Sequence, residues 1–246
     1  FQRDSMVSRR GLVLLDKYNP RGIRNVTFTA SVPDENVTTL SGGKRWFTDE
    51  DKKVEGTTSD PVADMKAIVR MLKRKSVPPF HIEVDEVSFL EDMEHTKWKI
   101  ALGRSTNNQI TQDAEGDAIA IGIANNMMDD EIKAAFRKIM GVNVVYSKSV
   151  VAVEKWNKET KKLERPIMRS FEPNTYAFVP DGTIGTIKTV APLMPDSTGL
   201  YGSFFDGRGV IKYSYDVKTM VQEWWSELTC LCVPNQSLNM YYLITK

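Results

Sequence analysis

The side chains that most often carry out chemistry in proteins are scarce in this chain. Its 246 residues include two histidines, His81 and His95, and two cysteines, Cys230 and Cys232. A catalytic triad or a histidine metal site needs a histidine beside a nucleophile or beside further ligands. His81 lies in a predicted strand and His95 in a charged helical turn, so solvated or locally bonded histidines are favoured. We therefore expect no catalytic residue.

The two cysteines are separated by Leu231 alone. On a strand both would lie on one face, about 7 Å apart, which is a poor geometry for a mutual disulfide. Without a second pair or a nearby histidine they make a weak zinc site. The pattern favours apolar packing in a reducing compartment.

Three glycine-containing motifs could in principle bind phosphate or support a nucleophile. LSGGKRW at 40–46 lacks the first glycine of a phosphate loop, and Arg45 occupies its Ser/Thr position. DGTIGT lacks a dinucleotide fingerprint, and YGSFFDG lacks the glycine of a nucleophile elbow. Asp129, Asp130 and Glu131 could attract a hard cation, but acids at a helix start complement its dipole. We expect no cofactor and no metal.

Composition excludes some classes of partner. Lys and Arg total 33 against 32 for Asp and Glu, so no strong field attracts nucleic acid or an anionic membrane. No apolar run is long enough to span a bilayer, and no secretory signal is recognisable. These features predict a packed cytoplasmic protein, and the 41% apolar content allows a sizeable core.

The elements with the strongest local signals lie between Thr57 and Trp98. Asp60 is placed to cap a helix and Pro61 fits its first position. An apolar stripe follows at helical spacing: Val62, Met65, Ile68, Val69 and Leu72. The helix should end by the Pro78–Pro79 pair.

A strand and a second helix follow this proline pair. Phe80, Ile82 and Val84 alternate with polar residues, which predicts an edge strand covered on one face only. Val87, Leu90 and Met93 then restart the helical spacing.

A further helix is predicted after residue 128. Asp129 or Asp130 is placed to cap it, and Gly141 is placed for a left-handed exit. Its buried stripe would be Ile132, Ala135, Phe136 and Ile139, and the valines from 142 to 153 favour adjoining strands.

Residues 25–47 predict a ribbon that lies before the first of these helices. Val26, Phe28, Ala30 and Val32 share one face, Pro33–Asn36 offers a turn, and Val37 to Trp46 would run back. A lone two-stranded ribbon is marginal in water, so it needs another surface. Lys44, Arg45, Trp46 and Phe47 favour a protein contact, because the following TDEDKKVEG alternates in charge. A solvated hairpin with a core tryptophan remains an alternative.

Taken in order, these segments resemble the major capsid proteins of tailed bacteriophages, particularly the lambda-type family with the Hong Kong 97 type fold. The resemblance lies in DPVADM, PPFHIEVDE, DDEIKAAFRKIMGVNVVYSKSVVAVEKWN, NTYAFVPDGTIGT and the closing segment from GLYGSFF to YYLIT. NVTFTASVPDENVTTLSGGKRWFTDEDKKVEGTTSDP is similar to the extended loop that precedes the family's spine helix. The resemblance covers nearly the whole chain.

The resemblance implies an α+β fold with an N-terminal arm remnant at 1–24 and an extended loop at 25–56. A peripheral domain, with the spine helix and a long antiparallel sheet, would comprise 57–105 and 200–246, and 106–199 would be mainly axial. In such a protein the extended loop contacts the neighbouring subunit. The expected contact residues are Phe28, Lys44, Arg45, Trp46, Phe47, Glu50 and Asp51.

The resemblance also implies a structural function without catalysis. Copies of the chain would assemble into the hexamers and pentamers of an icosahedral shell that encloses DNA without sequence-specific binding. Scaffolding and decoration proteins are further implied partners, and the location is the virion, assembled in the host cytoplasm. Two alternatives stay open: an encapsulin-like bacterial nanocompartment and a carboxylate-dependent hydrolase, such as a glycosidase or a metal-dependent enzyme.

Overall fold

In the computed structural model the chain divides into two compact units. Residues 1–184 and 236–246 form the first unit, and residues 185–235 form the second. The structure describes residues 2–8, 12–13, 26–27, 32–49, 53–75, 79–152, 155–157, 161–164, 167–189, 202–205, 210–216, 221–227, 230–234 and 239–245.

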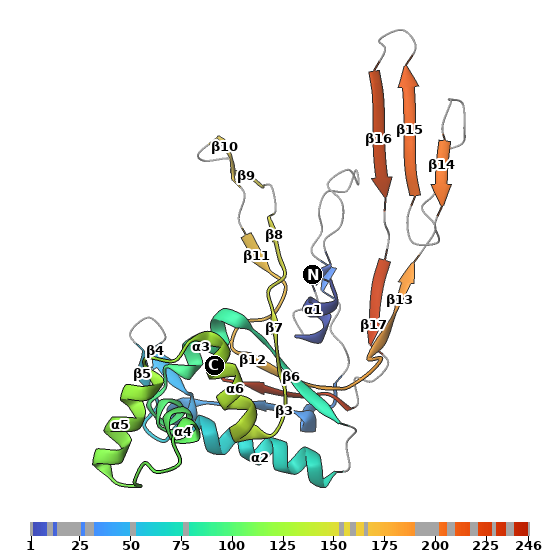
Figure 1. The fold of residues 1–246 in the computed structure, drawn as a ribbon. Helices are drawn as coiled ribbons and strands as arrows, with labels where there is room; N and C mark the ends of the chain where they lie inside the picture. The colour runs from blue at the N-terminus through green and yellow to red at the C-terminus, as the bar shows by residue number, and fades with distance from the viewer. Residues whose placement is uncertain are drawn as a thin grey trace. The chain divides into compact units, whose positions relative to one another are not determined.

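A five-stranded mixed sheet forms the centre of the first unit (Figure 1). Its order is β3 (Val37–Thr39), β18 (Tyr241–Ile244), β12 (Thr175–Pro180), β6 (Phe80–Asp85) and β7 (Val144–Ser147). β12 is antiparallel to both of its neighbours, whereas β3 and β7 pair in parallel at the two ends. Together with the helices, this sheet makes the protein α+β, as predicted.

Five helices accompany the sheet: α2 (Pro61–Arg74), α3 (Glu86–Met93), α4 (Thr96–Thr106), α5 (Ala114–Ala124) and α6 (Asp129–Met140). The larger core lies between helices and one sheet face. Met65 of α2, Trp98 of α4 and Phe136 of α6 pack there with Ile82 and Val84 of β6. The predicted stripes of α2 and α6 therefore face this core.

A second, smaller core covers the opposite face of the sheet. Val7 of α1 (Gln2–Val7), Phe171, Val179 and Tyr242 belong to it. β6 is consequently buried on both faces and lies between β12 and β7, so the prediction of an edge strand covered on one face is wrong. Polar positions on a strand indicate solvent only when no distant segment supplies partners for them.

Side chains at the helix ends set the helix boundaries as predicted, except at the start of α6. Asp60 accepts a hydrogen bond at 3.0 Å from the Ala63 N–H, so the predicted cap is confirmed. In α6 the cap position is Met128, not Asp129 or Asp130, and the Glu131 carboxylate accepts the Met128 N–H at 2.8 Å. Glu131 thus supplies the N3 half of a capping box, in which its carboxylate pairs with the N–H of the cap residue. Gly141 ends α6 with φ of +67°, as predicted.

The predicted ribbon at 25–47 is paired differently. β3 does not run back along β2 (Val26–Thr27), because it joins the central sheet parallel to β18. β2 pairs instead with β1 (Leu12–Val13). Single turns of 3-10 helix occupy Asp34–Asn36 and Gly42–Lys44, and β4 (Phe47–Asp49) pairs with β5 (Val54–Glu55).

Two further two-stranded ribbons follow β7. β8 (Val150–Ala152) pairs with β11 (Ile167–Arg169), and β9 (Lys155–Asn157) pairs with β10 (Lys162–Glu164). We call these four strands the β8–β11 ribbon.

The second unit contains strands alone among its described residues. β13 (Gly185–Thr189) pairs with β17 (Cys230–Pro234), and β14 (Gly202–Phe205), β15 (Val210–Asp216) and β16 (Val221–Glu227) form a three-stranded antiparallel sheet. On β17, Cys230 lies opposite Thr189 of β13, and Cys232 lies opposite Ile187 of β13.

Candidate functional site

The residues predicted to contact a neighbouring subunit divide into two groups in the structure. Lys44 and Arg45 are exposed, whereas Trp46 and Phe47 are buried within their own chain. Phe28, Glu50 and Asp51 lie outside the described residues. The exposed pair keeps the predicted contact role as an expectation, and the two aromatic side chains are not available on this chain's surface.

Trp46 is part of the larger core. Its side chain is fully buried, its ring centroid lies 5.3 Å from that of Tyr176, and its Nε1–H donates to Asp64 at 3.1 Å. Burial raises the pKa of the Asp64 carboxyl above its ordinary value, although the Trp46 hydrogen bond opposes this. The alternative of a core tryptophan, left open by the sequence, therefore describes Trp46.

His95, Ser59 and Glu55 come together in an arrangement that resembles a catalytic triad. His95 Nε2 lies 2.9 Å from Ser59 Oγ and 3.7 Å from Glu55 Oε2. Catalysis would require the carboxylate at the other ring nitrogen, where it would orient the base. Here Nδ1 accepts the Lys97 N–H at 3.2 Å, so Nε2 carries the proton and donates to Ser59.

Because the His95 ring donates a hydrogen bond to Ser59 and does not accept one from it, the three residues form a structural cluster. Ser59 Oγ in turn donates to the Gly56 carbonyl at 2.7 Å, and Glu55 accepts the Thr96 N–H at 2.6 Å. His95 thus caps α4 and ties the segment before α2 to it. Burial lowers the pKa of His95, which favours the neutral ring that this cap requires.

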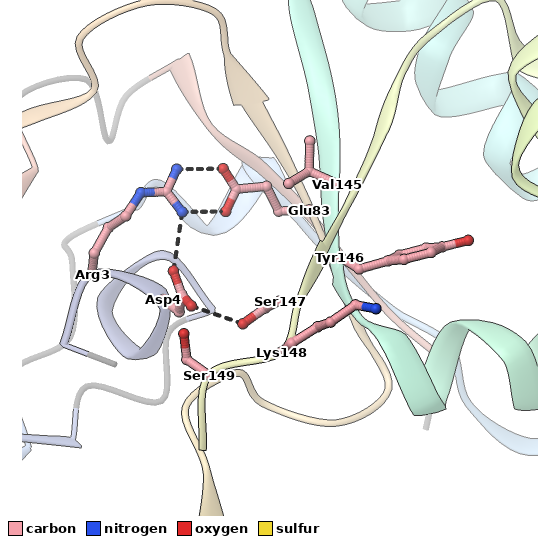
Figure 2. A pocket seen from close by; sticks show the side chains of 8 residues that line it. All are labelled: Arg3, Asp4, Glu83, Val145, Tyr146, Ser147, Lys148 and Ser149. Carbon is pink, nitrogen blue, oxygen red and sulfur yellow. Dashed lines mark hydrogen bonds and ion pairs between the residues drawn. The ribbon is translucent and has the colours of Figure 1, made fainter. Parts of the chain in front are cut away.

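A polar cavity lies between α1 and the sheet (Figure 2). It has a volume of about 320 Å³ and is lined by Arg3, Asp4, Glu83, Val145, Tyr146, Ser147, Lys148 and Ser149. Figure 2 shows Arg3, Asp4, Glu83 and Ser147 turned toward one another, with Tyr146 and Lys148 directed to the other side of β7.

Arg3 joins the two carboxylates of this cavity. Its guanidinium donates to both oxygens of Glu83, at 2.5 and 2.7 Å, and to Asp4 at 3.2 Å. Asp4 also accepts hydrogen bonds from Ser147 at 2.8 Å and Ser170 at 3.4 Å. We call these contacts the α1 clamp, because they hold α1 on the sheet face over β6 and β7.

The charges of the clamp do not suit acid–base catalysis. Burial alone would raise the pKa of Glu83, but hydrogen bonds from His81 and Arg3 outweigh it and hold this pKa below its ordinary value. Hydrogen bonds from Ser147, Ser149 and Arg3 likewise outweigh burial at Asp4 and lower its pKa. A glycosidase requires one carboxyl that stays protonated, and neither group meets that requirement.

His81 extends the clamp toward the end of β12. Its Nε2 lies 2.9 Å from Glu83 and its Nδ1 lies 2.7 Å from Asp181. The hydrogen bond to Glu83, followed by that to Asp181, raises the pKa of His81 against the effect of burial. His81 is therefore bonded to near neighbours.

Sequence reasoning did not find the α1 clamp. Glu83 appeared to be one of the polar positions of a half-covered strand, and its partner Arg3 lies 80 residues away. No local pattern links the two residues. The buried carboxylate becomes recognisable only when α1 is placed over β6.

Nothing in the described part of the chain forms a metal site, since no three His, Cys, Asp or Glu residues there gather as ligands. None of the helices in the same residues has the length and apolarity needed to cross a bilayer.

Exposed apolar side chains mark a candidate protein-contact surface. Ile167 and Val150 of the β8–β11 ribbon are 71% and 56% exposed, and Met128 at the start of α6 is 74% exposed. Val150 lies opposite Arg169, and Ile167 is two residues before Arg169 on the same strand, so alternation places these three residues on one face. Arg169 donates to Asp85 at 2.8 Å and fixes the base of the ribbon beside β6.

No protein-family model and no curated protein matches the chain. Among solved structures, a phage-related protein from Bordetella bronchiseptica RB50 is similar to it, with a TM-score of 0.46 and 13% identity. The match covers 87% of this chain and 57% of the other, so this chain spans little more than half of that protein's length. Similarity at this level assigns neither a family nor an activity.

Proposed function

We propose that this chain is a shell subunit, the major capsid protein of a tailed phage or prophage, which assembles with copies of itself into hexamers and pentamers. The shell would enclose DNA without sequence-specific binding, form in the host bacterial cytoplasm and become part of the virion. Scaffolding and decoration proteins are its further proposed partners. The order of segments that resembles the lambda-type capsid family supplies this proposal.

The secondary structure agrees with that order. α2, β6, α3 and α6 lie in segments that carry the resemblance, and Pro61 begins α2. These elements support a subunit with a rigid body, because the larger core joins them all.

The observation that carries the proposal is the exposed apolar surface of the β8–β11 ribbon. A two-stranded ribbon is marginally stable in water unless another surface covers it. Val150 and Ile167 nevertheless stand exposed on one face of this one. A neighbouring subunit would cover that face and remove its apolar side chains from water.

Weak contacts suffice for such a shell. Each subunit repeats the same heterologous contact with its neighbours, so small energies add around a closed assembly. The net charge of +1 leaves little long-range repulsion between copies.

Sedimentation velocity of the purified full-length protein over a range of concentrations tests the proposal. We expect growth from small species to large, discrete particles as concentration rises. Ile167→Ser should weaken this growth, whereas Val87→Ser, at an exposed apolar position of α3, should leave it unchanged. A wild-type protein that stays monomeric at every concentration would rule out a shell subunit.

A further inference from the structure

His95 joins the start of α4 to the segment that precedes α2. The residue is 1% exposed. Nδ1 of its ring accepts the Lys97 N–H at 3.2 Å, and Nε2–H donates to Ser59 Oγ at 2.9 Å. Only a neutral ring makes both bonds, because a protonated imidazole carries a hydrogen on each nitrogen and has no acceptor. The junction between α4 and this segment therefore depends on the charge of one side chain.

A proton taken from solvent would add to Nδ1, toward which the Lys97 N–H points. Two N–H donors would then face each other, and the first turn of α4 would lose one of its acceptors. The ring would also carry a positive charge at a buried position, which is unfavourable unless a counterion pairs with it. The docked arrangement is thus stable only while the ring is neutral.

The charged groups that face His95 come from the elements packed around it. Glu55 of β5 has Oε2 3.7 Å from Nε2, and Asp60 at the cap of α2 pairs with Lys97 of α4 at 2.9 Å. On the α3 side the Asp92 carbonyl accepts the His95 N–H, and the Asp92 carboxylate accepts another buried hydrogen bond. Burial lowers the pKa of His95 and outweighs the attraction of Glu55, so the surroundings favour the neutral ring.

The β4–β5 hairpin lies against α4 through contacts beside this ring. Glu55 accepts the Thr96 N–H at 2.6 Å, and the Phe47 ring meets the His95 ring edge-on, with the centroids 5.6 Å apart. A further ion pair, between the hairpin and α3, joins two exposed side chains at 3.9 Å and adds little. The hairpin is a two-stranded sheet separate from the five-stranded one. It can therefore leave α4 without breaking a strand pairing of the central sheet.

We propose that His95 is an acid-sensitive latch, which holds the β4–β5 hairpin and the turn at 56–59 on the start of α4 when its ring is neutral and releases them when the ring is protonated. The charged ring then reaches solvent, and Glu55 remains close to it. The release is local, because Trp46 and Trp98 stay in the larger core. This inference concerns the single subunit and does not depend on assembly.

Hydrogen exchange followed by mass spectrometry tests the latch on the full chain, at a low concentration where single subunits prevail. Peptides covering 53–59 and 96–99 report on its two sides. In the released state the hydrated ring regains its ordinary pKa of about 6.5. Below that pH the released state binds a proton more readily than the docked state, so release becomes up to about tenfold more favourable between pH 7.5 and 5.5. Protection of both peptides, corrected for the intrinsic exchange rate, should fall by that factor.

The start of α5 provides an internal control. The Gly116 N–H donates to the Asp113 carboxylate at 2.7 Å, and this bond lowers the pKa of Asp113. The carboxylate therefore stays ionised over the same pH range, and protection of a peptide covering 114–118 should not change. His81→Gln, which removes the other imidazole, should leave the response at 53–59 and 96–99 as in the wild type.

Two variants test the role of His95 itself. His95→Asn keeps an acceptor for the Lys97 N–H at the cap but does not titrate, so its protection should be the same at both pH values. Glu55→Gln keeps an oxygen for the Thr96 N–H and removes the charge that favours the protonated ring. Its protection should fall with pH at least as much as that of the wild type. Circular dichroism checks that each variant is folded.

Each outcome decides for or against the latch. A fall in the wild type that is absent in His95→Asn supports it. Constant protection in the wild type, or an equal fall in His95→Asn, overturns it. If His95→Asn does not fold, Glu55→Gln decides, since a smaller fall than in the wild type would show that protonation of His95 does not drive the release.

Discussion

Trp46 shows what a single residue contributes to this molecule. An aromatic residue beside two basic ones suggests a contact surface, yet the ring packs on Tyr176 and its N–H reaches Asp64. In the segment from 44 to 47, the exposed side chains are those of Lys44 and Arg45. The sequence allowed Trp46 to be either a subunit contact or a core residue. It could not decide between them, because Tyr176, which contacts the Trp46 ring, is 130 positions away.

Trp46→Ala should therefore destabilise the folded subunit. Removing a fully buried tryptophan costs about 3–5 kcal/mol of unfolding free energy, since it leaves a cavity and an unpaired Asp64. Arg45→Ala, at the exposed neighbouring position, should stay within about 0.5 kcal/mol of the wild type. Chemical denaturation measures both, and an unchanged unfolding curve for Trp46→Ala would contradict the core position.

The two histidines should titrate on opposite sides of their ordinary pKa of about 6.5. Hydrogen bonds to Glu83 and Asp181 raise the pKa of His81, whereas burial lowers that of His95. His81 then contributes stability below about pH 6.5, which is lost as pH rises through its folded pKa. The contribution of His95 to stability has the opposite pH dependence. Because its folded pKa is lowered, stability is lost as pH falls below about 6.5.

NMR of the two imidazole rings measures this directly. His81→Gln and His95→Gln each remove one resonance and so assign the other. We expect the His81 ring to titrate above, and the His95 ring below, a model histidine in the same buffer. Coincident titrations would show that the clamp and the α4 cap do not hold these rings as described.

At the scale of elements, local signals located α2, α3 and α6, but α4 and α5 were not predicted as separate helices and strand pairings were predicted poorly. Asp60, Pro61 and Gly141 act within one turn of their own helix, so their roles could be predicted from sequence. β3 pairs with β18 some 200 residues later, and no local pattern encodes that partner. The α1 clamp escaped prediction for the same reason, because Glu83 looks solvent-facing until Arg3 covers it.

The C-terminal end of α6 offers a matched test of backbone conformation. Gly141→Ala should lower the unfolding free energy by about 1 kcal/mol, because φ of +67° is unfavourable for alanine. Gly122 lies inside α5, where an added Cβ meets no atom within 4 Å. Gly122→Ala should therefore raise the unfolding free energy by up to about 1 kcal/mol. Equal effects at both positions would contradict the left-handed exit.

At the scale of the whole molecule, one unit combines a buried sheet with a ribbon on which Val150 and Ile167 are exposed. The first unit buries Trp46, Trp98 and Phe136, yet leaves Ile167 and Met128 largely in water. Sequence could predict the α+β class from the alternation of patterns. It could not predict which apolar residues would remain exposed, since that depends on the paired strands and on the helix that follows.

Electron microscopy of the purified full-length protein at high concentration tests the central claim most directly. The account predicts closed, uniform shells, with rings of five and six subunits visible in averaged images, and fewer shells when the exposed Ile167 is replaced by Ser. Micrographs that show only dispersed single subunits of the wild type, at every concentration and ionic strength tried, would contradict it.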